Sequence, residues 1–237
     1  GRITQGEIHL KGERIDNLPE PQKARLRGKR IGMVFQDPLT SLNPLYTVGQ
    51  QLVETIRTHL PLGEAEARQR AIDLLTEAGI PNATERIDSY PHQFSGGMRQ
   101  RVVIALAIAA EPELIIADEP TSALDVSVQA QIIKVLKKLC AKHGAAVMLI
   151  THDMGVIAET ADRIVVMHQG RIVETGSVGE IIRRPREPYK VKLINSIPTI
   201  ARGAAGAAAP AAANDDAGAF VQIRGLSRDF QLGNPGL

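Results

Sequence analysis

Hydrophobic and polar positions follow a helical period over three long stretches of this chain. Between Glu64 and Ala78 apolar residues recur every three or four positions, which predicts an amphipathic helix that stops at Gly79. Residues 98–110 are apolar on almost every side, so we expect a buried helix there. A third helix is predicted between Asp125, a candidate N-cap, and Gly144, a candidate C-terminal stop.

Shorter apolar runs between these stretches predict strands. Residues 163–176 read as two strands joined by a turn at Gln169–Gly170. The runs at 114–117 and 146–150 have no polar alternation, as in parallel strands that are buried on both faces. Two further strands are expected over residues 7–11 and 30–35. Strands that alternate with helices indicate an α/β fold with a parallel sheet.

The composition changes sharply near the C-terminal end of the chain. Residues 200–219 are almost entirely Ala, Gly, Pro, Asn and Asp, which is typical of a linker without a core. Strand-like alternation returns over residues 220–230, within the final segment 220–237. We therefore expect one domain over residues 1–199, a linker, and the start of a second domain. A tail that belongs to no domain is the alternative.

Charge and cysteine content exclude several classes of protein. The formal net charge is only +2, which favours neither a nucleic-acid surface nor a polybasic membrane patch. Cys140 is the single cysteine, so an internal disulfide and a cysteine-ligated zinc site are excluded, and a cytosolic compartment fits. No apolar run approaches the roughly 18 residues of a membrane-spanning helix.

Two adjacent carboxylates follow the apolar run at residues 114–117. Asp118 and Glu119 would emerge at the carboxyl edge of the sheet, where α/β proteins bind ligands. One carboxylate there could lie near Mg²⁺ while the other orients a water molecule. A solvated acidic turn after a strand is the structural alternative.

A second block, Phe94 to Arg101, reads FSGGMRQR and opens the buried helix. The Ser95 hydroxyl, the exposed amides of Gly96 and Gly97, and the positive end of a helix together suit a phosphate group. An ordinary N-cap with a flexible lead-in is the alternative interpretation.

Two further polar residues each follow a predicted strand. The amide of Gln36 could accept from a water molecule and donate to a phosphate oxygen. A neutral imidazole at His152 could contact a γ-phosphate or polarise an attacking water. Taken singly, each of these residues is more often exposed or part of the packing. The five other histidines have no such setting and are expected to be surface or packing residues.

Together these blocks resemble the nucleotide-binding domain of ATP-binding-cassette (ABC) transporters, over roughly residues 1–199. The resemblance implies a P-loop NTPase-like (RecA-like) core with a helical subdomain at about residues 45–108. The family's usual Leu-Ser-Gly-Gly-Gln string is replaced here by Phe94 to Met98. That form, with the segment from Asp37 to Gly49, resembles the ATPases of di- and oligopeptide importers.

The resemblance also implies a role for each matching residue. Asp118 corresponds to the Walker-B aspartate and, with Gln36 of the Q-loop, would bind Mg²⁺. Glu119 corresponds to the general base and His152 to the switch histidine. The residues that would contact nucleotide, in this site or in the opposite one of a head-to-tail pair, are Gln36, Ser95, Gly96, Gly97, Met98 and Asp125.

The function implied is ATP hydrolysis that energises an importer of peptides or related small ligands. Its expected partners are two transmembrane permease subunits and a second ABC domain, either in tandem on the same chain or as a dimer partner. An extracytoplasmic substrate-binding protein would act indirectly, and no nucleic acid is expected. The protein would lie peripherally at the cytoplasmic face of the inner (plasma) membrane.

The sequence contains no G-x-x-x-x-G-K-[ST] loop. In the family this loop and the adenine-stacking aromatic precede the position of Gly1, so we expect a fragment that alone hydrolyses ATP negligibly. Two alternatives remain open. One is a non-catalytic ABC half that serves as an interface module, and the other is a non-transport ABC ATPase. The second is disfavoured because no coiled-coil, zinc-binding or strongly basic insertion separates Gln36 from Ser95.

Overall fold

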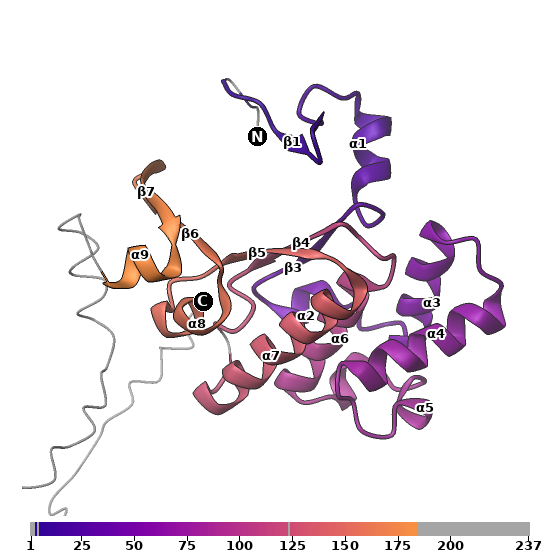
Figure 1. The fold of residues 1–237 in the computed structure, drawn as a ribbon. Helices are drawn as coiled ribbons and strands as arrows, with labels where there is room; N and C mark the ends of the chain where they lie inside the picture. The colour runs from indigo at the N-terminus through magenta and orange to yellow at the C-terminus, as the bar shows by residue number, and fades with distance from the viewer. Residues whose placement is uncertain (1–2, 4, 123, 184–237) are drawn as a thin grey trace, which may run out of the picture. The chain divides into compact units, whose positions relative to one another are not determined.

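The computed structural model describes residues 3, 5–122 and 124–183 (Figure 1). The chain divides into two units, residues 1–197 and 198–237, and every described residue belongs to the first. The predicted linker at 200–219, the predicted second domain at 220–237 and the end of the first domain lie outside the described residues.

A parallel sheet of three strands organises the described unit. The strands pair in the order β3–β4–β5, and their bounds are β3 (Ile31–Val34), β4 (Leu114–Asp118) and β5 (Ala146–Ile150). Val34 lies opposite Ala117, which in turn lies opposite Leu149. The predicted parallel sheet is therefore confirmed, and all three strands end at the same edge.

Two antiparallel pairs lie outside this sheet. They are formed by β1 (His9–Leu10) with β2 (Glu13–Arg14), and by β6 (Arg163–His168) with β7 (Arg171–Ser177). Gln169 and Gly170 join β6 to β7 with φ angles of 48° and 75°. Two successive positive φ values are what a tight hairpin turn requires, so the predicted turn is confirmed.

The helices include all three that the sequence predicts. The described residues form α1 (Glu20–Leu26), α2 (Pro38–Ser41), α3 (Val48–His59), α4 (Glu64–Glu77), α5 (Ala83–Arg86), the 3₁₀ turn η1 (Pro91–Gln93), α6 (Gly96–Ile108), α7 (Val126–His143), α8 (Met154–Thr160) and α9 (Val178–Arg183). The predicted helices correspond to α4, α6 and α7, although α6 starts two residues earlier than expected. In the described part of the chain no helix is both long and apolar enough to span a bilayer.

One helical turn, α2, follows β3 and its loop. Asp37 caps that turn by accepting a hydrogen bond from the Leu39 amide at 2.8 Å. Pro38 occupies the first helical position, where its missing N–H costs nothing.

One face of the sheet packs against helices. Val34, Ile115 and Ala117 are fully or almost fully buried in a core that they share with residues of α3, α4, α6 and α7. A Cβ atom at Gly32 would lie 2.2 Å from the carbonyl oxygen of Ala107 in α6. The absence of a side chain at this position therefore lets α6 lie directly against β3.

The opposite face of the sheet is open. Met33 and Met148, which lie on either side of Ile116, are 40% and 48% exposed, and Ile150 is 46% exposed. The prediction that residues 146–150 are buried on both faces is therefore wrong for the described unit. The apolar run was interpreted from a general property of parallel sheets, whereas no described helix covers this face of β5.

Candidate functional site

Three polar side chains meet at the carboxyl edge of the sheet. The Gln36 amide nitrogen donates to Glu119 Oε2 at 3.2 Å, and His152 Nδ1 lies 3.0 Å from Glu119 Oε1. Each residue follows a different strand, β3, β4 or β5, and parallel strands in register end side by side. Gln36 and His152, which are far apart in the sequence, thus both contact Glu119.

The Glu119 backbone has an unusual conformation. Its φ angle is +42°, in the left-handed region that a residue with a side chain seldom adopts. Its amide donates to the Ile150 carbonyl at 2.9 Å, and its own carbonyl accepts from the Ser122 amide and hydroxyl, each at 3.2 Å. These bonds hold the turn against a local cost of about 1–2 kcal/mol. Strained residues of this kind occur often at functional sites.

Asp118 ends β4 immediately before this turn and is half-buried. Within the described residues no three His, Cys, Asp or Glu side chains form a metal-binding group. That finding is compatible with Mg²⁺, which is commonly bound by one or two carboxylates together with waters and phosphate oxygens. Because Gln36 uses its amide nitrogen for Glu119, its amide oxygen is left as a possible ligand. The donor set of Asp118 and Gln36 therefore fits Mg²⁺.

The block from Ser95 to Met98 forms the N-terminus of α6. Ser95 Oγ accepts a bond from the Met98 amide at 3.4 Å, so this hydroxyl acts as the N-cap in the structure. A Cβ atom on Gly97 would lie 2.7 Å from Val128 Cγ1, so this glycine allows the first turn of α6 to approach α7 closely. No hydrogen bond within the described residues joins this block to Glu119.

Asp125 takes the N-cap position of α7 but makes no side-chain capping bond, which corrects part of its predicted role. Its carbonyl instead accepts from the Val128 and Gln129 amides. Gln129, which the sequence interpretation missed, donates through its side chain to the carbonyls of Thr121 and Leu124, each at 3.0 Å. The loop between β4 and α7 is thus held by an amide one turn inside the helix. In the sequence, this role is indicated only by the presence of a glutamine one turn after the N-cap of the predicted helix.

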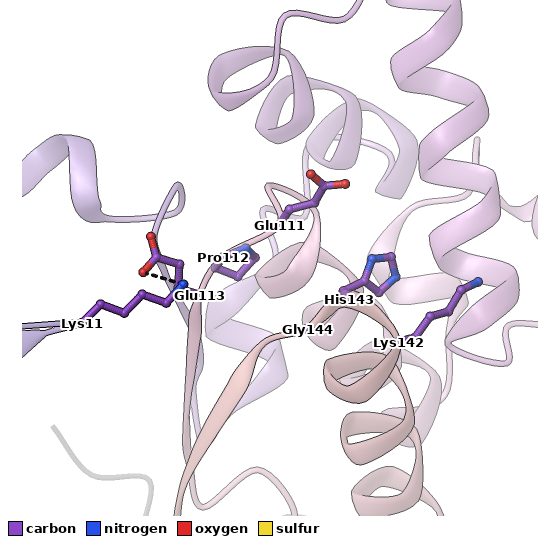
Figure 2. Close-up of a pocket in the computed structure, with 7 residues that line it drawn as sticks. All are labelled: Lys11, Glu111, Pro112, Glu113, Lys142, His143 and Gly144. Atoms are coloured by element: carbon purple, nitrogen blue, oxygen red, sulfur yellow. Dashed lines mark ion pairs between the residues drawn. The ribbon is translucent and has the colours of Figure 1, made fainter.

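The amino edge of the sheet carries a different set of charges (Figure 2). An open hollow of about 640 Å³ lies there, lined by Lys11, Glu111, Pro112, Glu113, Lys142, His143 and Gly144. Glu113 pairs with Arg30 at 2.8 Å and with Lys11 at 3.6 Å, and Arg30 holds the pKa of Glu113 below its ordinary value. Glu111 pairs with Arg70 at 3.0 Å. Because its charges already have protein partners, we do not assign the chemistry to this hollow.

A second histidine–glutamate pair lies beside this hollow. Glu77, the last residue of α4, lies 3.0 Å from His143 Nε2 and 2.7 Å from Lys142 Nζ. Burial raises the pKa of Glu77, but the bonds from Lys142 and His143 outweigh it and leave that pKa below its ordinary value. The pair joins the C-terminal ends of α4 and α7.

Comparison with known proteins agrees with this architecture. Residues 2–122 match the family described as ABC transporter. A solved structure of the ATP-binding cassette MJ0796, a dimer in a post-hydrolysis state bound to ADP and Pi, is 30% identical with a TM-score of 0.66, and the match covers 75% of each chain. The chain belongs to the ABC transporter family. Its fold is the P-loop NTPase-like α/β fold of these cassettes, as the sequence predicted.

Curated relatives of this cassette are peptide-transport proteins by name. The oligopeptide transport ATP-binding protein OppD of Bacillus subtilis is 50% identical over 200 residues, which are 84% of this chain and 56% of OppD. The dipeptide transport ATP-binding protein DppD of Escherichia coli is 48% identical over 202 residues, 85% of this chain and 62% of DppD. The chain thus spans about three fifths of the length of these relatives.

Proposed function

We propose that this cassette binds and hydrolyses ATP to energise an importer of peptides or related small ligands. The observation that carries the proposal is the contact of Gln36 and His152 with the two carboxylate oxygens of Glu119. An amide, a carboxylate and an imidazole within hydrogen-bonding distance can orient a water molecule, accept its proton and contact a phosphate. The similarity to OppD and DppD supports a peptide as cargo.

In the proposed mechanism Glu119 is the general base that accepts a proton from the attacking water. His152 fixes the orientation of the Glu119 carboxylate and contacts the γ-phosphate. Bound Mg²⁺, held by Asp118 and Gln36, would neutralise charge on the phosphate oxygens. Gln36 donates to Glu119 through its amide nitrogen at 3.2 Å, so its amide oxygen can serve the ion while this bond is kept.

The residues at the start of α6 are proposed to serve a second cassette. Ser95, Gly96, Gly97 and Met98 would contact the nucleotide of the opposite site, and Asp125 would lie at the interface between the cassettes. The dimeric form of the MJ0796 structures supports this arrangement. Phosphate oxygens suit the free amides of a helix N-terminus, because the positive end of the helix dipole lies there.

We propose that residues 45–108 form a helical subdomain that docks on two transmembrane permease subunits. Apolar side chains that follow Gln36 in the sequence support a docking surface here, since Leu39, Leu45 and Tyr46 are 63%, 80% and 50% exposed. Large apolar side chains exposed at this level suit a protein interface. The protein would work peripherally at the cytoplasmic face of the membrane, with an extracytoplasmic substrate-binding protein acting indirectly and without nucleic acid.

The domain plan remains a proposal as well. The cassette would cover residues 1–199, and residues 200–219 would link it to a second ABC domain that starts within 220–237. That second domain, or a separate dimer partner, would complete the pair of head-to-tail sites.

The test is MgATP hydrolysis by the full-length gene product, with a Glu119→Gln variant. We expect turnover to fall by about 100-fold or more, because general bases contribute roughly 10²–10⁴ to rate. Glu159→Gln, at an exposed glutamate of α8, is the matched control and should hydrolyse ATP normally. Wild-type protein without ATPase activity, or equal activity in both variants, would contradict the proposal. Peptide uptake by vesicles that contain the assembled transporter tests the choice of cargo.

A further inference from the structure

Arg99, in the first turn of α6, ties the start of this helix to the turn that precedes it. Its Nε donates to the Pro91 carbonyl at 2.8 Å, and its Nη2 donates to the His92 carbonyl at 3.4 Å. Its backbone amide donates to the Ser95 carbonyl at 2.9 Å. The segment from His92 to Ser95 is therefore held at one end by the side chain of an arginine and at the other by the backbone of the same residue.

The turn to which the Arg99 side chain bonds, η1, is itself fixed. The Tyr90 amide donates to Gln93 Oε1 at 2.7 Å, and Pro91 is buried. Phe94, directly after this turn, is 2% exposed, and the Arg86 guanidinium lies 5.8 Å from the centre of its ring. A bond from Arg99 to η1 is thus a bond to a rigid support.

This support extends to the start of α3. The Val48 and Gly49 amides donate to the carbonyls of Ser89 and Ile87 at 3.0 and 2.7 Å. A Cβ atom on Gly49 would lie 2.5 Å from Ile87 Cγ1, so glycine permits this close approach of the two backbones. Through η1, Arg99 therefore connects the first turn of α6 to a chain segment that is bonded to another helix.

The start of α6 needs such a connection. Gly96 and Gly97 occupy its first two helical positions, where the amides have no partner inside the helix. Two consecutive glycines give the backbone more freedom than any other residues would. The N-cap bond from the Met98 amide to Ser95 Oγ is long, at 3.4 Å, and restrains them weakly. The bonds of Arg99 therefore supply much of the order at these two amides.

Arg101, two residues further along α6, makes bonds of the same kind in another place. Its Nη1 donates to the Ala78 carbonyl at 2.8 Å, and its Nη2 donates to Gln131 Oε1 at 3.2 Å. These bonds join α6 to the end of α4 and to α7. Both arginines thus hold neighbouring elements together, but the side chain of Arg99 is the one that holds the segment before Gly96.

We propose that Arg99 is a positioning residue that pre-orders the Gly96 and Gly97 amides for the phosphate groups of the nucleotide in the opposite cassette. This inference rests on the proposed function, which assigns these amides to that nucleotide. Amides that are already in place lose less conformational entropy when they bind. Bound phosphate would hold the amides in the same arrangement without Arg99. Arg99 therefore lowers the ATP concentration that is needed and has little effect on the rate at saturation.

The first measurement is backbone hydrogen exchange over residues 92–98 in the full-length gene product without nucleotide. We expect Arg99→Met to speed this exchange about fivefold or more, because two bonds that restrain the segment are lost. Arg101→Met is the matched control and should exchange as wild type does over the same residues. Both variants should lower the Tm by about 2–4 °C, since each removes bonds from a charged donor.

The second measurement is the dependence of ATP turnover on MgATP concentration. We expect Arg99→Met to raise the KM about fivefold or more, while kcat changes by less than about twofold. Arg101→Met should leave both constants unchanged in spite of its lower Tm. Arg99→Lys is the conservative variant. Its ammonium group can donate to one of the two carbonyls, so it should restore part of the slow exchange and part of the KM.

Three results would overturn the inference. If Arg99→Met alters exchange and KM no more than Arg101→Met does, Arg99 only stabilises the fold. If exchange accelerates in Arg99→Met or Arg99→Lys while the KM stays at the wild-type value, the order of the segment does not affect nucleotide. A fall in kcat larger than the rise in KM would place Arg99 in the chemical step. Arg99→Lys carries the same test if the methionine variant does not fold.

Failure of the proposed function gives a different result. A wild-type protein that does not hydrolyse MgATP would contradict the assignment of the amides to nucleotide. The exchange comparison between Arg99→Met and Arg101→Met would still show whether Arg99 orders the start of α6, because it needs no nucleotide.

Discussion

Two histidine–glutamate pairs with the same separation lie at opposite edges of the sheet. His152 and Glu119 are 3.0 Å apart at the carboxyl edge, and His143 and Glu77 are 3.0 Å apart near the amino edge. The side chains of the first pair are 76% and 31% exposed, whereas those of the second are 15% and 21% exposed. The first pair can reach a ligand, and the second is enclosed by the helices that it joins.

The surroundings of the two pairs explain this difference. Both oxygens of Glu77 have partners, because Oε1 pairs with Lys142 and Oε2 pairs with His143. These groups lie at the ends of two packed helices. Glu119 is held by a neutral amide and a histidine on strand-end loops, and its own backbone is strained. The distance between a histidine and a glutamate therefore does not identify a functional site. Exposure, backbone conformation and neighbouring groups make the distinction.

The comparison is tested most strongly by truncating each histidine. We expect His152→Ala to reduce ATP turnover in the full-length protein by about 100-fold or more, because a group that orients the base and contacts phosphate is lost. Its Tm should stay within about 1 °C of wild type, since the side chain is 76% exposed. His143→Ala should lower the Tm and leave turnover unchanged. If His152→Ala instead lowered the Tm and His143→Ala reduced turnover, our interpretation of the two edges would be reversed.

The glutamate of the enclosed pair offers the next largest effect. Glu77→Gln should lower the free energy of unfolding by about 1–2 kcal/mol, because it leaves two half-enclosed basic groups without their carboxylate. Denaturant unfolding at neutral pH measures this change. Glu54→Gln, at an exposed residue of α3, is the matched control and should stay within about 0.5 kcal/mol of wild type. Equal losses in the two variants would show that the Glu77 pair stabilises nothing.

The effect of Glu77→Gln should also depend on pH. The pKa of Glu77 is lower in the folded protein than its ordinary value of 4.5. A lowered folded-state pKa contributes stability that is present above 4.5 and is lost as the pH falls through the folded value. The difference in stability between wild type and Glu77→Gln should therefore be constant near neutral pH and shrink below about pH 4.5. Unfolding curves at several pH values check this, and a difference that grows on acidification would contradict it.

Much of the carboxyl edge could be predicted from the sequence, because it depends on local order along the chain. Gln36, Glu119 and His152 each lie within two residues of the end of an apolar run, and parallel strands bring such positions together. The tight turn at Gln169–Gly170 was predictable for the same reason, since glycine tolerates the positive φ that the turn needs.

The amino edge could not be predicted in this way, because it depends on which helix ends meet in space. Nothing in the sequence near Glu77 indicates that His143, 66 positions away, will lie beside it. The complete burial of Gln100 in α6 is hidden for a related reason, since a glutamine in a helix is most often exposed. Long-range packing decides both cases, and short-range patterns do not record it.

The smallest effect concerns the strain at Glu119. We expect Glu119→Gly to abolish ATP turnover and yet raise the free energy of unfolding by about 0.5–1 kcal/mol. Glycine removes a left-handed backbone cost of about 1–2 kcal/mol, while its greater freedom in the unfolded chain takes back roughly half of that gain. Glu119→Ala is the decisive control, because it also removes the carboxylate but keeps the Cβ atom that causes the strain. Denaturant unfolding should therefore rank the glycine variant above the alanine variant. If the two are equally stable, the Glu119 backbone carries no strain, and the two edges differ only in exposure and in their neighbouring groups.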